Sequence, residues 1–172
     1  MQDTITRYLA SVGSEEDRRN LRAIFNPIAD RLSSQMLSNS TLVIGTDSNT
    51  VPKTGAAISY GVVQGVPVDI PAGTAMPALS GTVTADAFNV YCFFVDKAEA
   101  LTSAMGTEGA TFAAVVFPPF PEGKTLLGFV IINPTGTGNF VGGTDALDDG
   151  TVVPNAVYIS PVGPFDPSVK LS

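Results

Sequence analysis

The stretch Leu126–Gly143, LLGFVIINPTGTGNFVGG, joins an apolar run to a loop rich in glycine. Six of the seven residues Leu126 to Ile132 are large and apolar, and three of them are β-branched. Helices are longer than such a run, and half-exposed strands alternate apolar with polar residues, so the pattern favours a strand buried on both faces. Pro134 cannot donate to a ladder, and the glycines after it permit turns. The sequence therefore predicts a central core strand that ends in a structural loop.

Short apolar runs like this one continue from residue 41 to the C-terminus, separated by Gly, Pro, Asn and Ser. Such closely spaced strands predict a mainly β fold, an antiparallel β-sandwich or barrel, because βαβ units would need helical crossovers. Gln64-Gly65 is typical of a tight hairpin turn, and Asp96–Glu99 of a slightly longer one. The predicted strands are Thr41–Ile44, Ala57–Val63, Val66–Ile70, Gly81–Thr84, Phe88–Val95, Ala100–Met105, Thr111–Phe117, Leu126–Ile132, Phe140–Val141 and Ala156–Ile159.

The first 40 residues have helical periodicity instead. Residues 3–12 predict a short amphipathic helix, and Ser14 with the acids after it predicts the N-terminus of a second one. Pro27 falls inside the second pattern, so Asn26-Pro27 either starts a third segment or kinks a longer helix. The apolar face of this second pattern carries Leu21, Ile24, Phe25, Ile28, Leu32 and Met36.

These patterns divide the chain into a helical head, residues 1–40, and a β body with a proline-rich C-terminal tail, residues 41–172. So short a head cannot bury its apolar face alone. The face therefore either folds back on the body or meets copies of the chain or another protein. The tail, which contains Pro164 and Phe165, is either a simple closing segment or an arm that binds a neighbour.

The composition limits the classes of function that the chain can have. Of 172 residues, 44% are apolar, which suffices for a core, and the net charge is −7. All five arginines precede residue 40, so the head is neutral and the body acidic. No basic patch with interleaved aromatic residues suggests nucleic-acid binding, and no apolar stretch approaches a membrane span. We expect no secretory signal and therefore assembly in the cytoplasm.

The residues that commonly carry catalysis are scarce. The chain has no histidine, which removes Ser/His/Asp and Cys/His nucleophile systems and histidine-based zinc sites. Cys92 stands alone in an apolar run and is expected to be a buried structural thiol. A pair of carboxylates acting as a glycosidase is conceivable, but the acids mostly fall in turns. We therefore expect no enzymatic activity, catalytic residue or cofactor.

Two loop motifs could suggest ligands. Gly136, Gly138 and Gly142 miss the spacing of a dinucleotide-binding loop, and no Lys-Ser/Thr follows them, so a structural loop is favoured. Asp145 and the neighbouring acids Asp148 and Asp149 could hold Ca²⁺, but they do not match an EF-hand, and a solvated acidic turn is favoured. No metal site is therefore predicted.

Three aromatic residues, Phe120, Phe140 and Phe165, stand beside Pro or Gly outside confident strands. Such a residue either plugs the edge of a core or anchors a partner, and the sequence favours neither.

Residues 80–165 resemble a group of tailed-bacteriophage virion proteins. The segments that carry the resemblance are, in order, FNVYCFFVD, ALTSAMGTEGAT, FPPFPEGKTLLGFVIINPTGTGNFVGGT and TVVPNAVY. They look like the β modules of phage capsid decoration and fibre-type proteins, whose motif carries no catalytic residues. The helical head lies outside the resemblance.

This resemblance implies a capsid decoration or cement protein on the virion surface. Its expected partners are the major capsid protein and copies of itself, as a homotrimer or another cyclic oligomer. The expected contact residues are Leu21, Phe25, Ile28, Leu32 and Met36 in the head or Pro164 and Phe165 in the tail. The alternative is a receptor or glycan-binding module of a head or tail fibre, for which the chain, without Trp, has few aromatic platforms.

Overall fold

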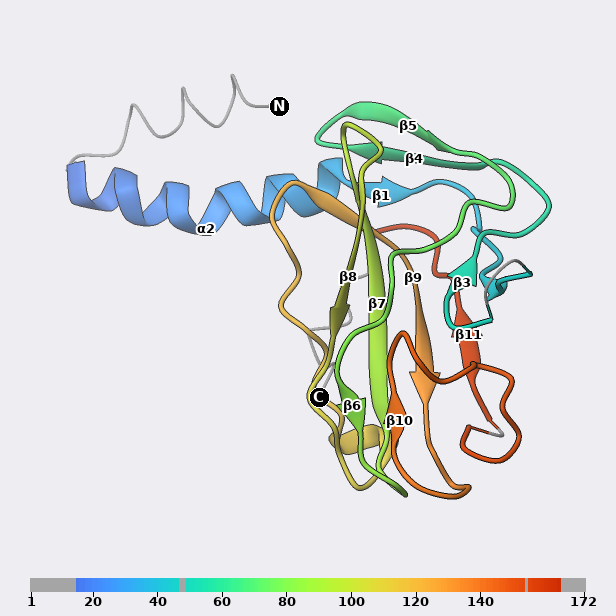
Figure 1. Cartoon of the computed structure of the whole chain (residues 1–172). Helices are drawn as coiled ribbons and strands as arrows, with labels where there is room; N and C mark the ends of the chain where they lie inside the picture. Colours follow the sequence, from blue (N-terminus) through green and yellow to red (C-terminus); the bar gives the residue numbers. More distant parts are fainter. Residues whose placement is uncertain (1–14, 47–48, 154, 165–172) are drawn as a thin grey trace.

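The computed structural model describes residues 15–46, 49–153 and 155–164. These residues form a mainly β, antiparallel, sandwich-like body and one long helix, α2 (Glu15–Ser33), as Figure 1 shows. The predicted fold class is thereby confirmed. The predicted helix at residues 3–12 and the Ser14 cap lie outside the described residues. α2 continues through Pro27, so a separate third helical segment is excluded.

A four-stranded antiparallel sheet in the order β11-β9-β7-β8 forms the centre of the body. β9 contains the predicted core strand and pairs with β7 on one side and β11 on the other. The register of this pairing shifts between Phe93 and Phe94, where Leu127 of β9 is the extra residue of a β-bulge. The strands are β7 (Asn89–Asp96), β8 (Leu101–Met105), β9 (Lys124–Ile132) and β11 (Val157–Ile159).

The two faces of this sheet bury separate clusters. Tyr91, Phe93 and Val95 face the larger cluster, which also contains residues of two smaller sheets. Alternate residues of β7 face a second cluster, which the segment around Phe117 and Phe120 covers. The smaller sheets consist of β1 (Gln35–Met36), β4 (Ser59–Val63) and β5 (Val66–Ile70), and of β6 (Thr82–Val83) with β10 (Phe140–Val141).

Both predicted hairpin turns are confirmed. Gln64 and Gly65 join β4 to β5 with φ values of 52° and 80°, the left-handed pair that a two-residue hairpin turn needs. The loop between β7 and β8 closes around Asp96, whose Oδ1 accepts hydrogen bonds from the amides of Ala98 and Ala100.

The outer edge of β5 offers few free donors. β5 is the last strand of its sheet, and alternate residues direct their amides away from β4. At Pro67 there is no amide hydrogen, and the amide of Asp69 donates to Oε1 of Glu99 at 3.0 Å. Glu99 comes from the β7–β8 loop, so one hairpin caps the edge of another.

One predicted strand is wrong. Residues Thr111–Phe117 form a short 3₁₀ helix, η1 (Phe112–Ala114), and a bridge between Val116 and Thr107. Val115 and Phe117 instead pack on the second cluster, so the apolar run covers a sheet rather than joining it. β2 (Val43–Ile44) pairs with β3 (Pro52–Lys53). Neither β3 nor β1 was predicted as a strand.

Candidate functional site

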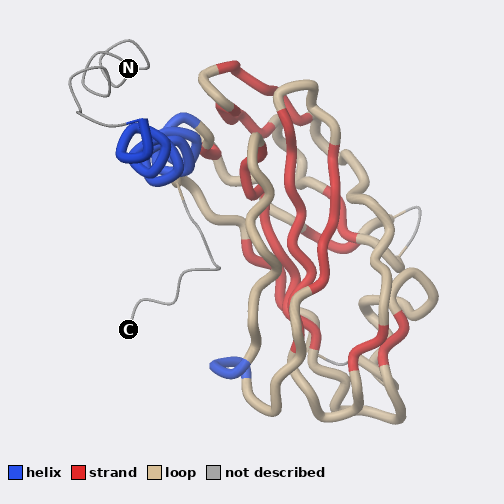
Figure 2. The backbone as a smooth tube through the Cα atoms, turned by 90° about the vertical axis from the view of Figure 1, so that its left-hand side faces the viewer, coloured by secondary structure: helices blue, strands red, loops and turns tan. Residues whose placement is uncertain are grey.

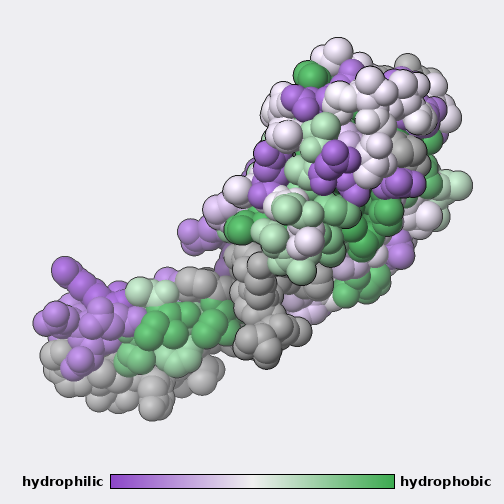
Figure 3. Space-filling model, turned by 90° about the horizontal axis from the view of Figure 1, so that it is seen from below, coloured by the Kyte–Doolittle hydropathy of each residue, from purple (hydrophilic) through white to green (hydrophobic). Residues whose placement is uncertain are grey.

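The most exposed apolar surface on any described element lies along α2. Ile24, Ile28 and Leu32 are 58%, 48% and 57% exposed, and Leu21 and Phe25 are half-buried. In Figure 3 hydrophobic side chains gather along the helix. Exposed aliphatic side chains are ordinary when scattered, but several on one helix face indicate a binding surface. We call Leu21, Ile24, Phe25, Ile28 and Leu32 the α2 face.

Hydrogen bonds at the last turn of α2 tie the helix to the body. The Asp30 carboxylate accepts hydrogen bonds from the Gln64 side chain at 3.2 Å and from the Gly123 amide at 3.1 Å. The carbonyl of Ser33 accepts one from the Gly65 amide at 3.0 Å. Figure 1 shows the rest of the helix extending away from the β-sheets, and Figure 2 shows the helix nearly end-on beside the body. These contacts fix the direction of α2 and leave its length uncovered by the described part of the body.

Asp30 was not predicted as a functional residue, although the sequence contains a signal for it. A carboxylate in the last turn of a helix is disfavoured by the partial negative charge of that end. Hydrogen bonds from residues outside the helix offset this unfavourable interaction, and Asp30 receives such bonds from Gln64 and Gly123.

Met36 does not belong to the α2 face. It lies in β1, opposite Gly61 of β4, and only 1% of it is exposed. A Cβ on Gly61 would lie 2.9 Å from the Met36 sulfur, so the glycine makes room for it. Helical spacing extended to this residue in the sequence, but the helix ends at Ser33 and the chain enters the sheet.

Of the two predicted contact residues in the tail, the structure describes one. Pro164 is exposed, and the preceding Gly163 donates a hydrogen bond to the Met36 carbonyl at 2.8 Å. Phe165 lies outside the described residues, so its predicted contact role stays a prediction.

Two of the three loop aromatics help to build the core. Phe140 is fully buried and packs edge-on against Tyr91, with ring centroids 6.2 Å apart. Phe120 is half-buried and packs edge-on against Phe94 at 5.3 Å. For these two residues the core alternative is correct. Phe165 is not described.

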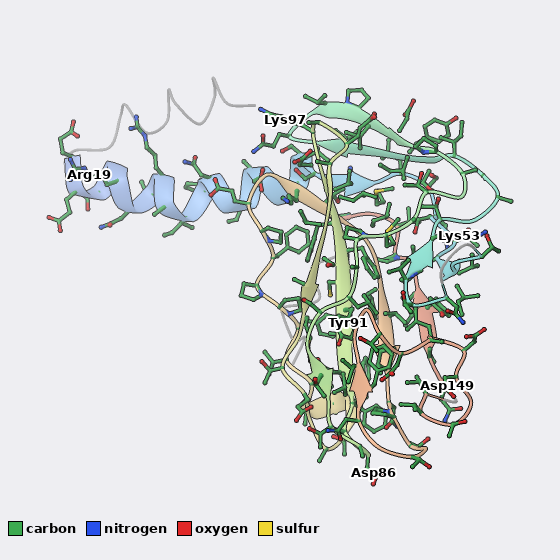
Figure 4. The ribbon with its side chains drawn as sticks, viewed as in Figure 1. Arg19, Lys53, Asp86, Tyr91, Lys97 and Asp149 are labelled. Carbon is green, nitrogen blue, oxygen red and sulfur yellow. The ribbon has the colours of Figure 1, made fainter. Side chains whose placement is uncertain are left out.

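The acids of the body stabilise turns. An Asp145 oxygen accepts the Val141 amide at 2.6 Å, Asp148 accepts the Asn49 side chain, and Asp149 accepts the Thr151 amide. Within the described residues no group of three or more Asp, Glu, Cys or His is arranged to hold a metal ion. Figure 4 shows Asp86 and Asp149 on the part of the body far from α2.

The glycine loop is built by close packing. Gly136 lies against the Thr151 backbone carbonyl so closely that no side chain fits, and Gly143 has a φ of 79°. Both constraints require glycine for structural reasons. They need no bound phosphate to explain them.

The potentially reactive side chains of the core are inert. Burial raises the pKa of the Cys92 thiol to about 12, and that of the Tyr91 hydroxyl also to about 12. Cys92 is fully buried, so its predicted role as a structural thiol agrees with its position. Since thiolate is the reactive form, this cysteine has little nucleophilic character at neutral pH.

Comparison of the chain with protein-family models, curated proteins and solved structures finds no match. In the described residues, no helix has both the length and the apolar character that crossing a membrane requires.

Proposed function

We propose that this protein is a non-enzymatic structural component of a tailed-phage virion, a capsid decoration or cement protein that binds the outer shell and stabilises it. The observation that supports this proposal best is the α2 face: an apolar helix surface held away from a self-contained β body. An element built in this way serves binding. The resemblance of residues 80–165 to phage decoration modules supplies the expected partner, the major capsid protein.

In this proposal the head end docks on the shell and the acidic body points outward. Each contact can be modest, because many copies on a symmetric lattice add restraint wherever the shell would otherwise open. The acidic side chains far from α2 give neighbouring bodies the same charge, so the bodies repel one another and do not aggregate.

A non-enzymatic role agrees with what the acids and the cysteine do. Asp30, Asp96, Asp145 and Asp149 accept hydrogen bonds from amides of turns and loops. Cys92 is buried and its pKa is raised. These side chains therefore have structural tasks.

The test mixes the full chain with capsids of its phage that lack it, followed by sedimentation and quantification of the bound protein. Saturation at a copy number matching the equivalent lattice positions supports a cement protein. Saturation at a handful of copies contradicts it and favours a vertex or fibre component, for which binding to a glycan array is the next measurement.

The same assay tests α2. The double variant Phe25→Asp/Ile28→Asp should lose capsid binding while the body stays folded, because aspartate cannot be buried there without a partner. The matched control is Ile58→Asp: Ile58 is also 48% exposed but lies in the body, and this variant should bind normally. Normal binding by the double variant would contradict docking through the head.

A further inference from the structure

α2 receives little support from the described part of the body. It is 19 residues long, and its described contacts with the body are confined to the last turn. Isolated helices are marginal in water, and most helices in proteins are stabilised by packing of their apolar face. None of the described side chains of α2 is buried. Among the described residues nothing packs along the length of the helix, and a partner there would stabilise it.

The spacing of the α2 face indicates what kind of partner. Leu21, Phe25, Ile28 and Leu32 follow one another at intervals of four, three and four residues. This is the seam of a heptad repeat, in which Leu21 and Ile28 occupy d positions and Phe25 and Leu32 occupy a positions. Such a seam fits another helix with the same repeat.

We propose that α2 packs against α2 of other copies of this chain, in a parallel, in-register bundle. In that arrangement each g position lies next to the e position five residues later on the neighbouring helix. Asp17 then meets Arg22, a pair of opposite charge, and Ile24 meets Ala29, a pair of apolar residues. Both flanking pairs match in kind, and the seam is apolar from Leu21 to Leu32, although the preceding a position is Arg18. A second copy is therefore the partner that this seam and its flanking pairs fit.

The residues of the seam also favour a number of copies. Leucine at a with isoleucine at d shifts parallel coiled coils from two strands to three or four, and Leu32 and Ile28 have this arrangement. The bundle thus contains three or four chains, with the β bodies at one end. In the bundle the α2 face points inward, so the head meets the shell through the outside or the end of the bundle, and Phe25→Asp/Ile28→Asp should lose capsid binding because the bundle is lost. The bundle rests on the proposed function only for this place on the shell.

The first test measures the mass of the full chain in solution by light scattering after size exclusion. A mass three or four times 17.8 kDa is expected. Ile28→Asp should reduce it to that of one chain, and Ile58→Asp should leave it unchanged. A monomeric or dimeric wild-type chain, or an Ile28→Asp variant of unchanged mass, would overturn the bundle. The urea midpoint of each variant shows that its body is folded.

The second test measures orientation with a short bis-maleimide, for which buried Cys92 provides a silent background. Leu32→Cys should crosslink efficiently, because in a parallel bundle residue 32 meets its own copy. In a fully overlapped antiparallel pair the two would lie roughly 24 Å apart along the axis. Asn26→Cys, at an outer b position, is the control and should remain uncrosslinked. Crosslinking at residue 26 but not 32 would refute the arrangement.

Both experiments omit capsids. Failure of the bundle therefore shows as a monomer in solution, whereas failure of the proposed function shows as an oligomer that does not sediment with capsids.

Discussion

β7 and α2 illustrate opposite ways of using apolar residues. Seven of the eight residues of β7 are buried, and six of them belong to the two clusters on the two sides of one sheet. α2 is more than twice as long, yet none of its described side chains is buried. The body buries its own apolar side chains, while the described residues leave those of the helix exposed or half-buried. If the helix binds a partner as proposed, stability and interaction depend on different segments, and mutations should separate them.

The strongest separation is expected from truncating a large side chain in each region. Phe93→Ala removes a fully buried ring and should cost about 3–5 kcal/mol in the free energy of unfolding. Phe25→Ala in α2 should change the unfolding of the body by less than about 0.5 kcal/mol. Urea unfolding followed by tyrosine fluorescence measures both. Comparable losses in the two variants would show that α2 belongs to the cooperative unit of the body.

Alkaline pH should act on the body alone. The pKa of Cys92 is about 12 in the folded chain against 9.0 without burial, so the unfolded chain loses this proton first. The stabilisation is complete below pH 9 and is lost as the pH rises towards 12, with a loss of about 3 kcal/mol by pH 11. Urea midpoints from pH 8 to 11 should fall less steeply for Cys92→Ala. Equal slopes would contradict a role for the thiol.

A methyl group added inside the central sheet should have a somewhat smaller effect. In Gly128→Ala the new Cβ would lie 2.7 Å from the Ile159 carbonyl oxygen and 2.5 Å from Cδ1 of Leu42. The expected cost is about 1–3 kcal/mol, since β9 and β11 must move apart. Gly150→Ala, where nothing lies within 4 Å, is the matched control. A wild-type melting temperature for Gly128→Ala would mean that β11 adapts freely.

Removing the Asp30 hydrogen bonds that connect α2 to the body should have the smallest effect on stability. Asp30→Ala removes the acceptor of two hydrogen bonds at a half-buried site and should cost about 1 kcal/mol. Hydrogen exchange of the Gly123 amide should become faster, because that amide loses its partner. Unchanged exchange at Gly123 would show that this hydrogen bond does not persist in solution.

The sequence predicted best those elements whose burial shows in their own residues. The strand Val66–Ile70 and the pair Phe140–Val141 were predicted with correct bounds, and β7 and β9 to within two residues. The strands β1 and β3 are two residues long, too short to show an alternation of their own, so no local pattern marks them. Residues 111–117 have the apolar character of a strand, but they cover a sheet face that is not visible in sequence.

The candidate site was predicted in part for the same reason. Helical periodicity identified Leu21, Phe25, Ile28 and Leu32, because an amphipathic face is a local property. It included Met36 wrongly, since the end of a helix at Ser33 depends on the pairing of β1 with β4. The role of Asp30 could not be predicted in full, because Gln64 and Gly123 come near it only in the folded chain.

The capped edge of β5 lowers the risk that closely spaced copies of the chain aggregate through their sheets. Where many copies lie side by side, the unpaired backbone groups of an edge strand can pair with a strand of the next chain and form a continuous intermolecular sheet. Pro67 and the Asp69–Glu99 hydrogen bond remove the donors that would begin such growth on this edge. Along β5, the chain can therefore reach a high local density without turning ordered neighbours into an aggregate.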